Sequence, residues 1–285
     1  MLKKEQHLDF FLDDRYPFLN NFKRVFKQSL CIFSLAVIAL TTPLIISCSD
    51  DGKDEITSNS IPDSTRRKVA FFDGDFNPVD NGHLAILKEA KDTIHLDTIF
   101  LMPYGRTDFS EIDVSYSDRR YMLELALEDY GDPSFVISDL ISSENVSVNP
   151  TRLFKELRAE FGPRKPLFYI IGSSILNDLD EMGYLDVINY VNIICIKSVG
   201  GELSKLNKNM KDYVQKYIVR EEDPKFLEYT NDPCGHFFYI DRQATNVSIH
   251  KIKESIKEGL SNSYVKENMN PRVAKYAVEK GLYSH

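Results

Sequence analysis

The 285-residue sequence has no tryptophan, only four cysteines and no excess of basic residues. A net charge of −8 excludes the broad basic face that nonspecific nucleic-acid binding requires. An acidic protein can still bind nucleotides, because a few local donors and a metal ion suffice. Internal repeats and low-complexity segments are also missing. The 42% of hydrophobic residues is ample for the core of one large α/β domain or two small ones.

The four cysteines can form at most two disulfides, and two of them lie in the N-terminal segment. Cys31 and Cys48 belong to an apolar N-terminal segment, Cys195 lies in the run Asn192–Ile196, and Cys234 lies in a Pro-Cys-Gly turn. The apolar run predicts a buried thiol at Cys195. A Cys195–Cys234 disulfide is the alternative in an oxidising compartment.

Residues 1–48 predict an N-terminal lead followed by an export or anchor segment. Basic residues at 23–27 precede residues 29–47, a stretch of 19 residues without a charge and near the length that spans a bilayer. The stretch ends in Ile-Ile-Ser-Cys, which resembles a bacterial lipobox. That resemblance implies lipidation at Cys48, and an uncleaved signal anchor is the alternative. Both interpretations attach the protein to a membrane and place the following domain in the cell envelope, outside the cytoplasm.

The remaining chain divides into a tether and one domain. Residues 49–66 are polar and predict a flexible tether. From 67 to 285, short apolar runs alternate with segments of helical periodicity. We expect strands at 68–72, 97–102, 135–138, 167–171, 192–197 and 237–240, and helices at 82–92, 118–129, 150–160, 173–180, 184–190, 207–218, 248–258 and 271–280. This alternation predicts an α/β fold, a Rossmann-like parallel sheet with helices on both faces, which binds ligands beyond the carboxyl ends of its strands.

The most informative stretch follows the first expected strand. Residues 69–84 pass from apolar residues into a turn, Gly74-Asp75-Phe76-Asn77-Pro78, and then into a helix start at Gly82-His83. Backbone N–H groups in such a turn and at a helix N-terminus are suited to receive a phosphate. The stretch therefore predicts a phosphate site beyond the carboxyl end of the first expected strand.

The same stretch resembles the signature of the nucleotidylyltransferase superfamily, a Gly-x-Phe-(Asp/Asn)-Pro turn followed by His-x-Gly-His. Asp80 stands in place of the first histidine. Later segments resemble one branch of that superfamily, the nicotinate-nucleotide adenylyltransferases of NAD biosynthesis: Arg119–Ala126, Phe168–Leu176, Asn246–Lys253 and Asn270–Tyr283. The resemblance covers residues 68–283. It implies transfer of AMP from ATP to a mononucleotide, with release of pyrophosphate and usually with Mg²⁺.

The resemblance also implies the site residues. Nucleotide-binding positions are Gly74, Asp75, Phe76, Gly82, His83, Gly172, Ser173, Ser248, His250 and Lys253. Among them, His83 and Lys253 are the catalytic candidates, His83 as donor to the α-phosphate and Lys253 as a replacement for the arginine that holds the leaving phosphates. Substrate-binding positions are Ser147, Asn149 and Arg119. Met182 stands where the resemblance implies an aromatic side chain against the pyridine ring.

Three carboxylates in the first motif allow both a catalytic and a non-catalytic interpretation of the site. Asp73, Asp75 and Asp80 either gather Mg²⁺, since carboxylates suit that ion, or belong to a site that no longer tolerates a triphosphate. In the second case the chain is a non-catalytic surface lipoprotein that keeps the fold to bind a nucleotide or a protein. A further interpretation takes Phe71–Asp75 as the start of a haloacid-dehalogenase-like phosphatase with Asp73 as nucleophile, and it leaves the later motifs unexplained.

Overall fold

The computed structural model describes residues 67–105, 113–142, 148–198, 201–242 and 247–284. The lead, the expected lipidation site Cys48 and the tether lie outside the described residues. Within the described ranges, no helix has the length and apolar character needed to cross a membrane. The chain divides into two compact units, and the second, residues 64–137 and 141–285, holds every described helix and strand.

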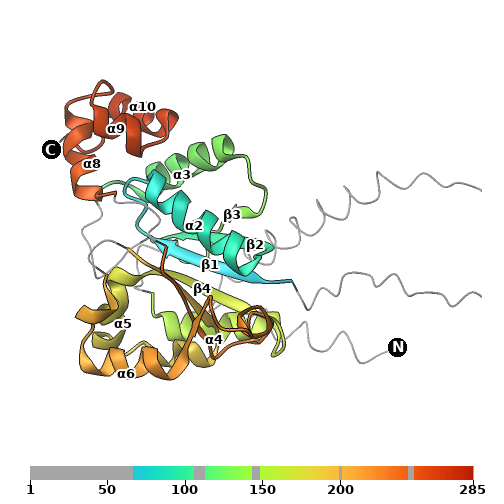
Figure 1. Ribbon diagram of the computed structural model, residues 1–285. Helices are drawn as coiled ribbons and strands as arrows, with labels where there is room; N and C mark the ends of the chain where they lie inside the picture. The colour runs from blue at the N-terminus through green and yellow to red at the C-terminus, as the bar shows by residue number, and fades with distance from the viewer. Residues whose placement is uncertain (1–66, 106–112, 143–147, 199–200, 243–246, 285) are drawn as a thin grey trace, which may run out of the picture. The chain divides into compact units, whose positions relative to one another are not determined.

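A parallel sheet of seven described strands forms the centre of this unit (Figure 1). Its order is β3-β2-β1-β4-β5-β7-β6, and every neighbouring pair is parallel. The strands are β1 (Val69–Gly74), β2 (Thr98–Pro103), β3 (Phe135–Ile137), β4 (Leu167–Gly172), β5 (Asn192–Ile196), β6 (Ile218–Arg220) and β7 (Phe237–Ile240). The expected α/β class and parallel sheet are confirmed. Because the chain builds outward from β1 to β3 and then returns to pair β4 with β1, the order reverses between β1 and β4.

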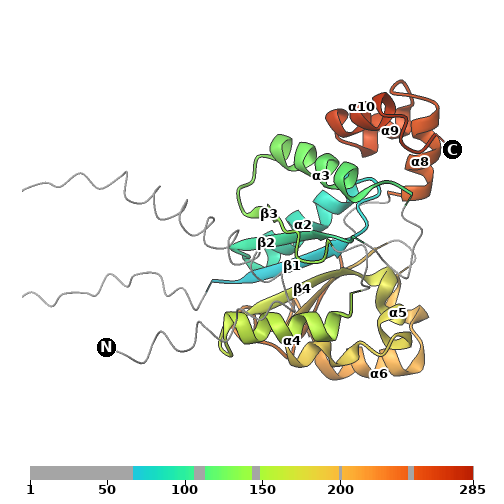
Figure 2. The same cartoon turned by 180° about the vertical axis from the view of Figure 1, so that it is seen from behind.

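Helices cover both faces of the sheet. The α-helices are α2 (Asn81–Ile94), α3 (Tyr116–Tyr130), α4 (Pro150–Phe161), α5 (Leu176–Glu181), α6 (Lys208–Tyr217), α7 (Phe226–Tyr229), α8 (Ile249–Lys257), α9 (Ser263–Asn268) and α10 (Pro271–Glu279). In both ribbon views α2 and α3 lie on one face and α4 to α6 on the other (Figures 1 and 2). Alternation along β1 explains this sandwich, since Ala70 and Phe72 belong to the core under α2 while Phe71 packs against Phe154 of α4.

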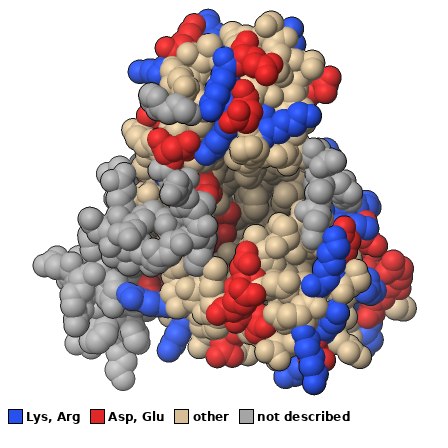
Figure 3. All heavy atoms as spheres, turned by 90° about the vertical axis from the view of Figure 1, so that its left-hand side faces the viewer, with Lys and Arg blue, Asp and Glu red and all other residues tan. Residues whose placement is uncertain are grey.

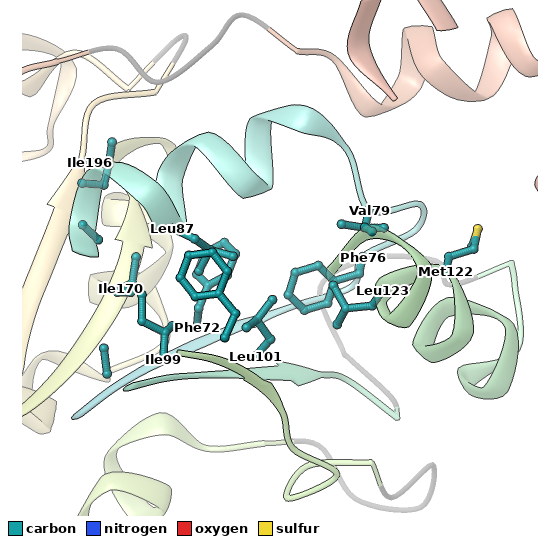
Figure 4. Close-up of a cluster of buried hydrophobic side chains, with 14 of the residues drawn as sticks. Phe72, Phe76, Val79, Leu87, Ile99, Leu101, Met122, Leu123, Ile170 and Ile196 are labelled. Atoms are coloured by element: carbon teal, nitrogen blue, oxygen red, sulfur yellow. The ribbon is translucent and has the colours of Figure 1, made fainter. Parts of the chain in front are cut away.

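The core under α2 extends to the turn that follows β1. Leu87 of α2 packs with Phe72 of β1 and Ile170 of β4, and Phe76 and Val79 of the turn join the same cluster (Figure 4). All five side chains are buried. The start of α2 is therefore fixed to the sheet by apolar contacts on both sides of the turn.

Several expected elements differ from those observed. Residues 185–189 form a 3₁₀ helix, η4, rather than the expected α-helix, and the helix expected at 207–218 ends at Tyr217 because the chain enters the short strand β6. Strand β6 and helices α7 and α9 were not expected; each has six residues or fewer. Cys195 and Cys234 are both free thiols, so the alternative of a disulfide is wrong. Burial raises the pKa of the Cys195 thiol, as expected for a buried cysteine.

Candidate active site

The candidate site lies at the carboxyl ends of β1 and β4, the two strands at which the order reverses. The expected phosphate turn follows β1, and Gly172-Ser173 ends β4 and begins the next turn. Seen from these strand ends, the surface is hollowed between the C-terminal helices and the body of the sheet, and acidic side chains are visible inside the hollow (Figure 3). This is the position at which open α/β sheets bind ligands.

Phe76 supports the site from below rather than lining it. Its side chain is buried, its ring centroid lies 5.7 Å from that of Phe72 and 5.3 Å from that of His83, and its φ is +46°. A left-handed backbone is costly for a bulky residue and persists only where packing determines it. The ring of Phe76 therefore packs against His83, and the expected nucleotide-binding role of Phe76 stays a prediction.

Asp80 caps the helix that His83 begins. Its side chain is 3% exposed, and Oδ1 accepts a hydrogen bond from the backbone N–H of His83 at 2.9 Å. The buried Gly82 donates its backbone N–H to the same carboxylate. These are orphan amides of a helix N-terminus, which an Asp cap satisfies. Asp80 therefore takes amides that the sequence predicted for a phosphate.

The ring of His83 also pairs with Asp80. Nδ1 lies 2.8 Å from Oδ1 of the carboxylate, and the His83 side chain is 21% exposed. Burial alone would lower the pKa of His83, but the charges of Asp80 and Asp75 and the Asp80 hydrogen bond outweigh it and raise the pKa above its ordinary value. Burial alone would raise the pKa of Asp80, and its contacts with His83 and Gly82 lower it instead. The pair therefore favours an imidazolium beside a carboxylate.

Asp73 lies on the opposite face of β1 from Phe72, away from α2. Its carboxylate accepts hydrogen bonds from Tyr104 Oη at 2.7 Å and Tyr169 Oη at 3.0 Å. Burial raises the pKa of Asp73 to about 6, and these two bonds limit the rise. Burial also raises the pKa of both tyrosines. The carboxyl is thus engaged within the protein.

This arrangement corrects the expected metal site. Among the residues that the structure describes, no three His, Cys, Asp or Glu side chains lie close enough to hold one metal ion. Asp73 is bonded to tyrosines, Asp80 caps α2, and Asp75 alone of the three lies in the turn between them. The residues do not fit a protein-bound Mg²⁺, because Asp73 and Asp80 are already engaged by protein partners and the three carboxylates do not form one described cluster.

Arg119 is a structural residue, contrary to the expectation that it binds substrate. It is fully buried in the first turns of α3. Its guanidinium donates to the carbonyl oxygens of Asp75 at 2.6 Å and Val114 at 3.1 Å, and also to that of Tyr104. A rigid fork of donors suits three carbonyls at once. Arg119 thus ties the turn after β1 to Tyr104, the residue after β2, and to Val114, the residue before the N-cap of α3.

Lys253 is brought to the phosphate turn from the far end of the domain. Its Nζ lies 2.9 Å from Oδ1 of Asp113, which also accepts from Asn77 Nδ2 at 2.6 Å. Burial alone would raise the pKa of Asp113, and the bonds from Asn77 and Lys253 lower it. Lys253 Nζ also lies 5.3 Å from the ring centroid of the buried Tyr283. Asp113 therefore bridges the turn after β1 and helix α8.

The start of α8 is organised as expected. Ser248 is its N-cap, accepting from the backbone N–H of Lys251 at 3.3 Å and donating its own N–H to Tyr264 Oη at 2.9 Å. His250 is exposed on the first turn. Lys251 Nζ lies 4.1 Å from the ring centroid of Tyr264. Basic side chains at a helix N-terminus are suited to an anion, and the capping role of Ser248 leaves its expected nucleotide role untested.

The turn after β4 is held by the chain that follows β5. Ser173 is buried, and its Oγ accepts from the backbone N–H of Ser198 at 2.9 Å. A Cβ built on Gly201 would lie only 2.5 Å from the backbone of Ser173 and Ser174. Gly201 therefore permits a close approach between two loops, and a larger residue would displace the Gly172-Ser173 turn.

The described residues do not bring the expected substrate-binding side chains together in one place. Ser147 lies outside the described residues. Asn149 is the N-cap of α4, its Oδ1 accepting from the backbone N–H of Arg152 at 2.9 Å. Met182 is partly exposed at the C-terminus of α5. The substrate roles of Ser147 and Asn149 stay predictions.

Sequence reasoning missed Asp113, Tyr104, Tyr169 and Gly201. Asp113 has its partner Lys253 140 residues away, so no local pattern marks it. Tyr104 and Tyr169 follow or lie within apolar strands and resemble ordinary core residues. Gly201 belongs to a Gly-Gly pair, a turn signal that could have drawn attention to this loop.

Comparisons with known proteins agree with this geometry. A family model described as cytidylyltransferase-like matches residues 71–267. A protein of Wigglesworthia glossinidia brevipalpis named "probable nicotinate-nucleotide adenylyltransferase" is 30% identical over 219 residues, which are 75% of this chain and 96% of that protein. The nicotinate-nucleotide adenylyltransferase of Salmonella typhi is 27% identical over 217 residues, 75% of this chain and 97% of the relative.

A solved structure shares the fold. The nicotinic acid mononucleotide adenylyltransferase of Plasmodium falciparum, complexed with NaAD, superposes with a TM-score of 0.58 at 12% identity, covering 76% of this chain and 97% of the other. The expected nucleotidylyltransferase fold is thus confirmed independently of sequence identity.

Proposed function

The chain belongs to the cytidylyltransferase-like family and is a nucleotidyltransferase, and on that premise we propose that it transfers AMP from ATP to nicotinate mononucleotide. The choice of substrates follows the names of the relatives. The assignment of His83 and Lys253 to the site is supported by their positions in the structure. The observation that carries the proposal is the Asp113 bridge, which sets the Lys253 amine beside the turn that leads to His83. His83 and Lys253, which are 170 positions apart in the sequence, are thereby both available near the carboxyl end of β1.

The reaction needs positioning and charge stabilisation rather than a covalent intermediate. A phosphate oxygen of the mononucleotide attacks the α-phosphorus of ATP, forming one P–O bond. The bond from the α-phosphorus to the bridging oxygen breaks, and pyrophosphate leaves with the electron pair. We assign to His83 a hydrogen bond to a non-bridging α-phosphate oxygen, and to Lys253, with Ser248, the leaving phosphates.

Lys253 must exchange partners for this role. In the structure it bonds Asp113, whose carboxylate is half exposed. An exposed ion pair contributes about 0–1 kcal/mol, so a polyphosphate with several charges can replace the carboxylate as the partner of Lys253. The Mg²⁺ implied by the resemblance has no site among the described carboxylates, and we assign it no protein ligand.

The test is product formation by the full-length chain in detergent. ATP and nicotinate mononucleotide are supplied, and the dinucleotide and pyrophosphate are quantified by chromatography, with nicotinamide mononucleotide in parallel. His83→Ala and Lys253→Met each remove a preorganised donor, which costs about 10²–10³-fold in kcat. His95→Asn, at the other end of α2, and Lys257→Met, on the exposed side of α8, are the matched controls.

The outcomes separate the alternatives. Equal loss in the control and site variants would argue against the assigned roles of His83 and Lys253. If the wild-type chain forms no dinucleotide from either mononucleotide and does not bind ATP in a calorimetric titration, the transferase proposal fails. A chain that binds ATP without turnover would be the non-catalytic form of the fold.

We further propose that residues 1–48 export the chain, that Cys48 is lipidated and that residues 49–66 tether the domain of residues 67–285 in the cell envelope. The charge-free run that ends at Cys48 supports this, as does the family match, which begins only at residue 71. Radiolabelled fatty acid fed to expressing bacteria should enter the wild-type chain and not Cys48→Ser. Equal labelling of both proteins would refute lipidation at Cys48.

A further inference from the structure

Asp80 stands where the resembled signature has a histidine, and its position in the structure shows what it does there. The carboxylate is buried beside the His83 ring and accepts from the first amides of α2. A buried carboxylate with several bonds to one neighbour fixes the geometry of that neighbour. Asp80 therefore acts on His83 rather than facing a phosphate itself.

The distances determine where the Nδ1 proton lies. Nδ1 of His83 is 2.8 Å from the carboxylate Oδ1 and 3.3 Å from the backbone nitrogen of Asp80. A bare Nδ1 would place a lone pair against a carboxylate oxygen at hydrogen-bond distance, which is repulsive, and would gain only the longer bond from the backbone N–H. Nδ1 therefore carries a proton and donates it to Asp80.

The state of the other ring nitrogen then depends on the charge of the ring. A neutral imidazole with its proton on Nδ1 presents a lone pair at Nε2, and a lone pair repels phosphate oxygen. Only the imidazolium has N–H at both positions. The His83 side chain is 21% exposed, so part of the ring is accessible to a ligand.

The groups that face His83 decide that charge. The helix N-terminus and burial disfavour a cation. The rings of Phe72 and Phe76 lie 6.2 Å and 5.3 Å from the imidazole and carry no charge. The opposing groups are the carboxylates of Asp80 and Asp75. Without Asp80, the surroundings of His83 would favour the neutral ring.

We propose that Asp80 is a positioning residue that holds His83 as an imidazolium, with Nδ1–H on the carboxylate and Nε2–H left for a phosphate oxygen. A single charged histidine then supplies the donor charge that the resembled signature distributes over two histidines. The inference rests on the proposed transferase function for its place in catalysis. The charge state itself can be measured without turnover.

The first test is a titration of the His83 ring by NMR. The full-length chain is labelled with ¹⁵N-histidine, and His83→Gln identifies the His83 signals among the six histidines. Asp80→Asn keeps an oxygen for the amides of α2, since Asn and Asp cap helices about equally well, but it removes the charge. We expect both His83 nitrogens to stay protonated to higher pH in the wild type than in Asp80→Asn.

Inorganic tripolyphosphate serves as the ligand in the same experiment. At a pH where the two proteins differ in charge, it should shift the Nε2 signal of the wild type and leave that of Asp80→Asn unchanged. Identical His83 titrations in the two proteins would overturn the proposal. So would an Nδ1 signal that is unprotonated in the wild type at neutral pH.

The second test is the pH dependence of kcat/KM. Above neutral pH, Asp80→Asn should lose about 10²-fold, the cost of one preorganised donor, and should regain activity as the pH falls. Asp118→Asn, which removes a carboxylate from the first turn of α3, is the matched control and should keep the wild-type profile. A purely structural Asp80 would lower activity equally at every pH and lower the melting temperature.

The two arms separate this inference from the proposed function. Wild-type turnover with an unshifted pH profile in Asp80→Asn would refute the inference alone. An inactive wild type whose His83 titration and tripolyphosphate response still depend on Asp80 would support the Asp80–His83 assignment and refute the transferase.

Discussion

Replacing Arg119 by lysine separates a structural role from a substrate-binding one. The buried guanidinium donates to three backbone carbonyls, those of Asp75, Tyr104 and Val114. Lysine keeps the charge but has a single nitrogen, which cannot reach three carbonyls arranged around a planar fork. At least two buried acceptors then lose their partner.

The magnitude follows from those two bonds. Each hydrogen bond from a charged group contributes about 1.5–3 kcal/mol, so losing two of them in Arg119→Lys should lower the free energy of unfolding by about 3–6 kcal/mol. Domains have about 5–15 kcal/mol in total. The variant should therefore still fold, with a melting temperature about 10 °C lower.

Urea denaturation followed by circular dichroism measures this change, and Arg120→Lys is the control on the next residue. Arg120 is partly exposed and pairs with Glu124, so its replacement should cost less than about 1 kcal/mol. If Arg119→Lys unfolds at the wild-type urea concentration while its KM for either substrate rises, Arg119 binds substrate and the structural assignment is refuted.

Three further changes test other features of the site. Gly201→Ala places a Cβ 2.5 Å from the Ser173 backbone and should destabilise the fold by about 1–3 kcal/mol, measured by thermal melting; an unchanged melting temperature would show that the loops separate freely. Because burial raises the pKa of Asp73 to about 6, the folded protein binds this proton more tightly than the unfolded chain, and stability is lost as pH rises through 6. Asp73→Asn should thus gain about 3 kcal/mol relative to wild type between pH 4 and pH 7.5 in urea titrations, and a constant difference across that range would contradict the shift. Asp113→Asn should lower the Kd for ATP by up to about fivefold in calorimetry, because Lys253 no longer leaves an ion pair worth about 1 kcal/mol, and weaker binding would show that the bridge orders the site instead.

The fold was largely predictable because its signals are local. Apolar runs such as Phe168–Ile171 indicate strands, and Ser, Asp or Asn before a periodic segment indicates the start of a helix. Both patterns can be recognised within a few residues. Strand β6 has three residues and begins where α6 ends, so it is too short to show an alternating pattern and the expected helix included its first residue. Its pairing with β7 is a tertiary contact that no local pattern encodes.

The site was predictable in part. The position of His83 was expected, and Asp80 could have been assigned as the N-cap from its place before an expected helix. Arg119 was expected to bind substrate, because the carbonyls that bury it, those of Asp75 and Tyr104, are distant in sequence and no local pattern reveals them. The metal prediction failed because the partners that engage two of the carboxylates, Tyr104 and Tyr169 for Asp73 and the start of α2 for Asp80, are set by tertiary structure and capping rather than by the spacing of the acidic residues.

The Asn77–Asp113–Lys253 bridge has a consequence for the order in which the molecule acquires its parts. Asn77 and Asp113 are 36 residues apart, and Asp113 and Lys253 are 140 apart. Synthesis releases the chain from its N-terminus, so the turn after β1 emerges long before α8. During that interval the Asp113 carboxylate lacks its lysine. The contact that joins the two ends of the domain can therefore form only after α8 has been made.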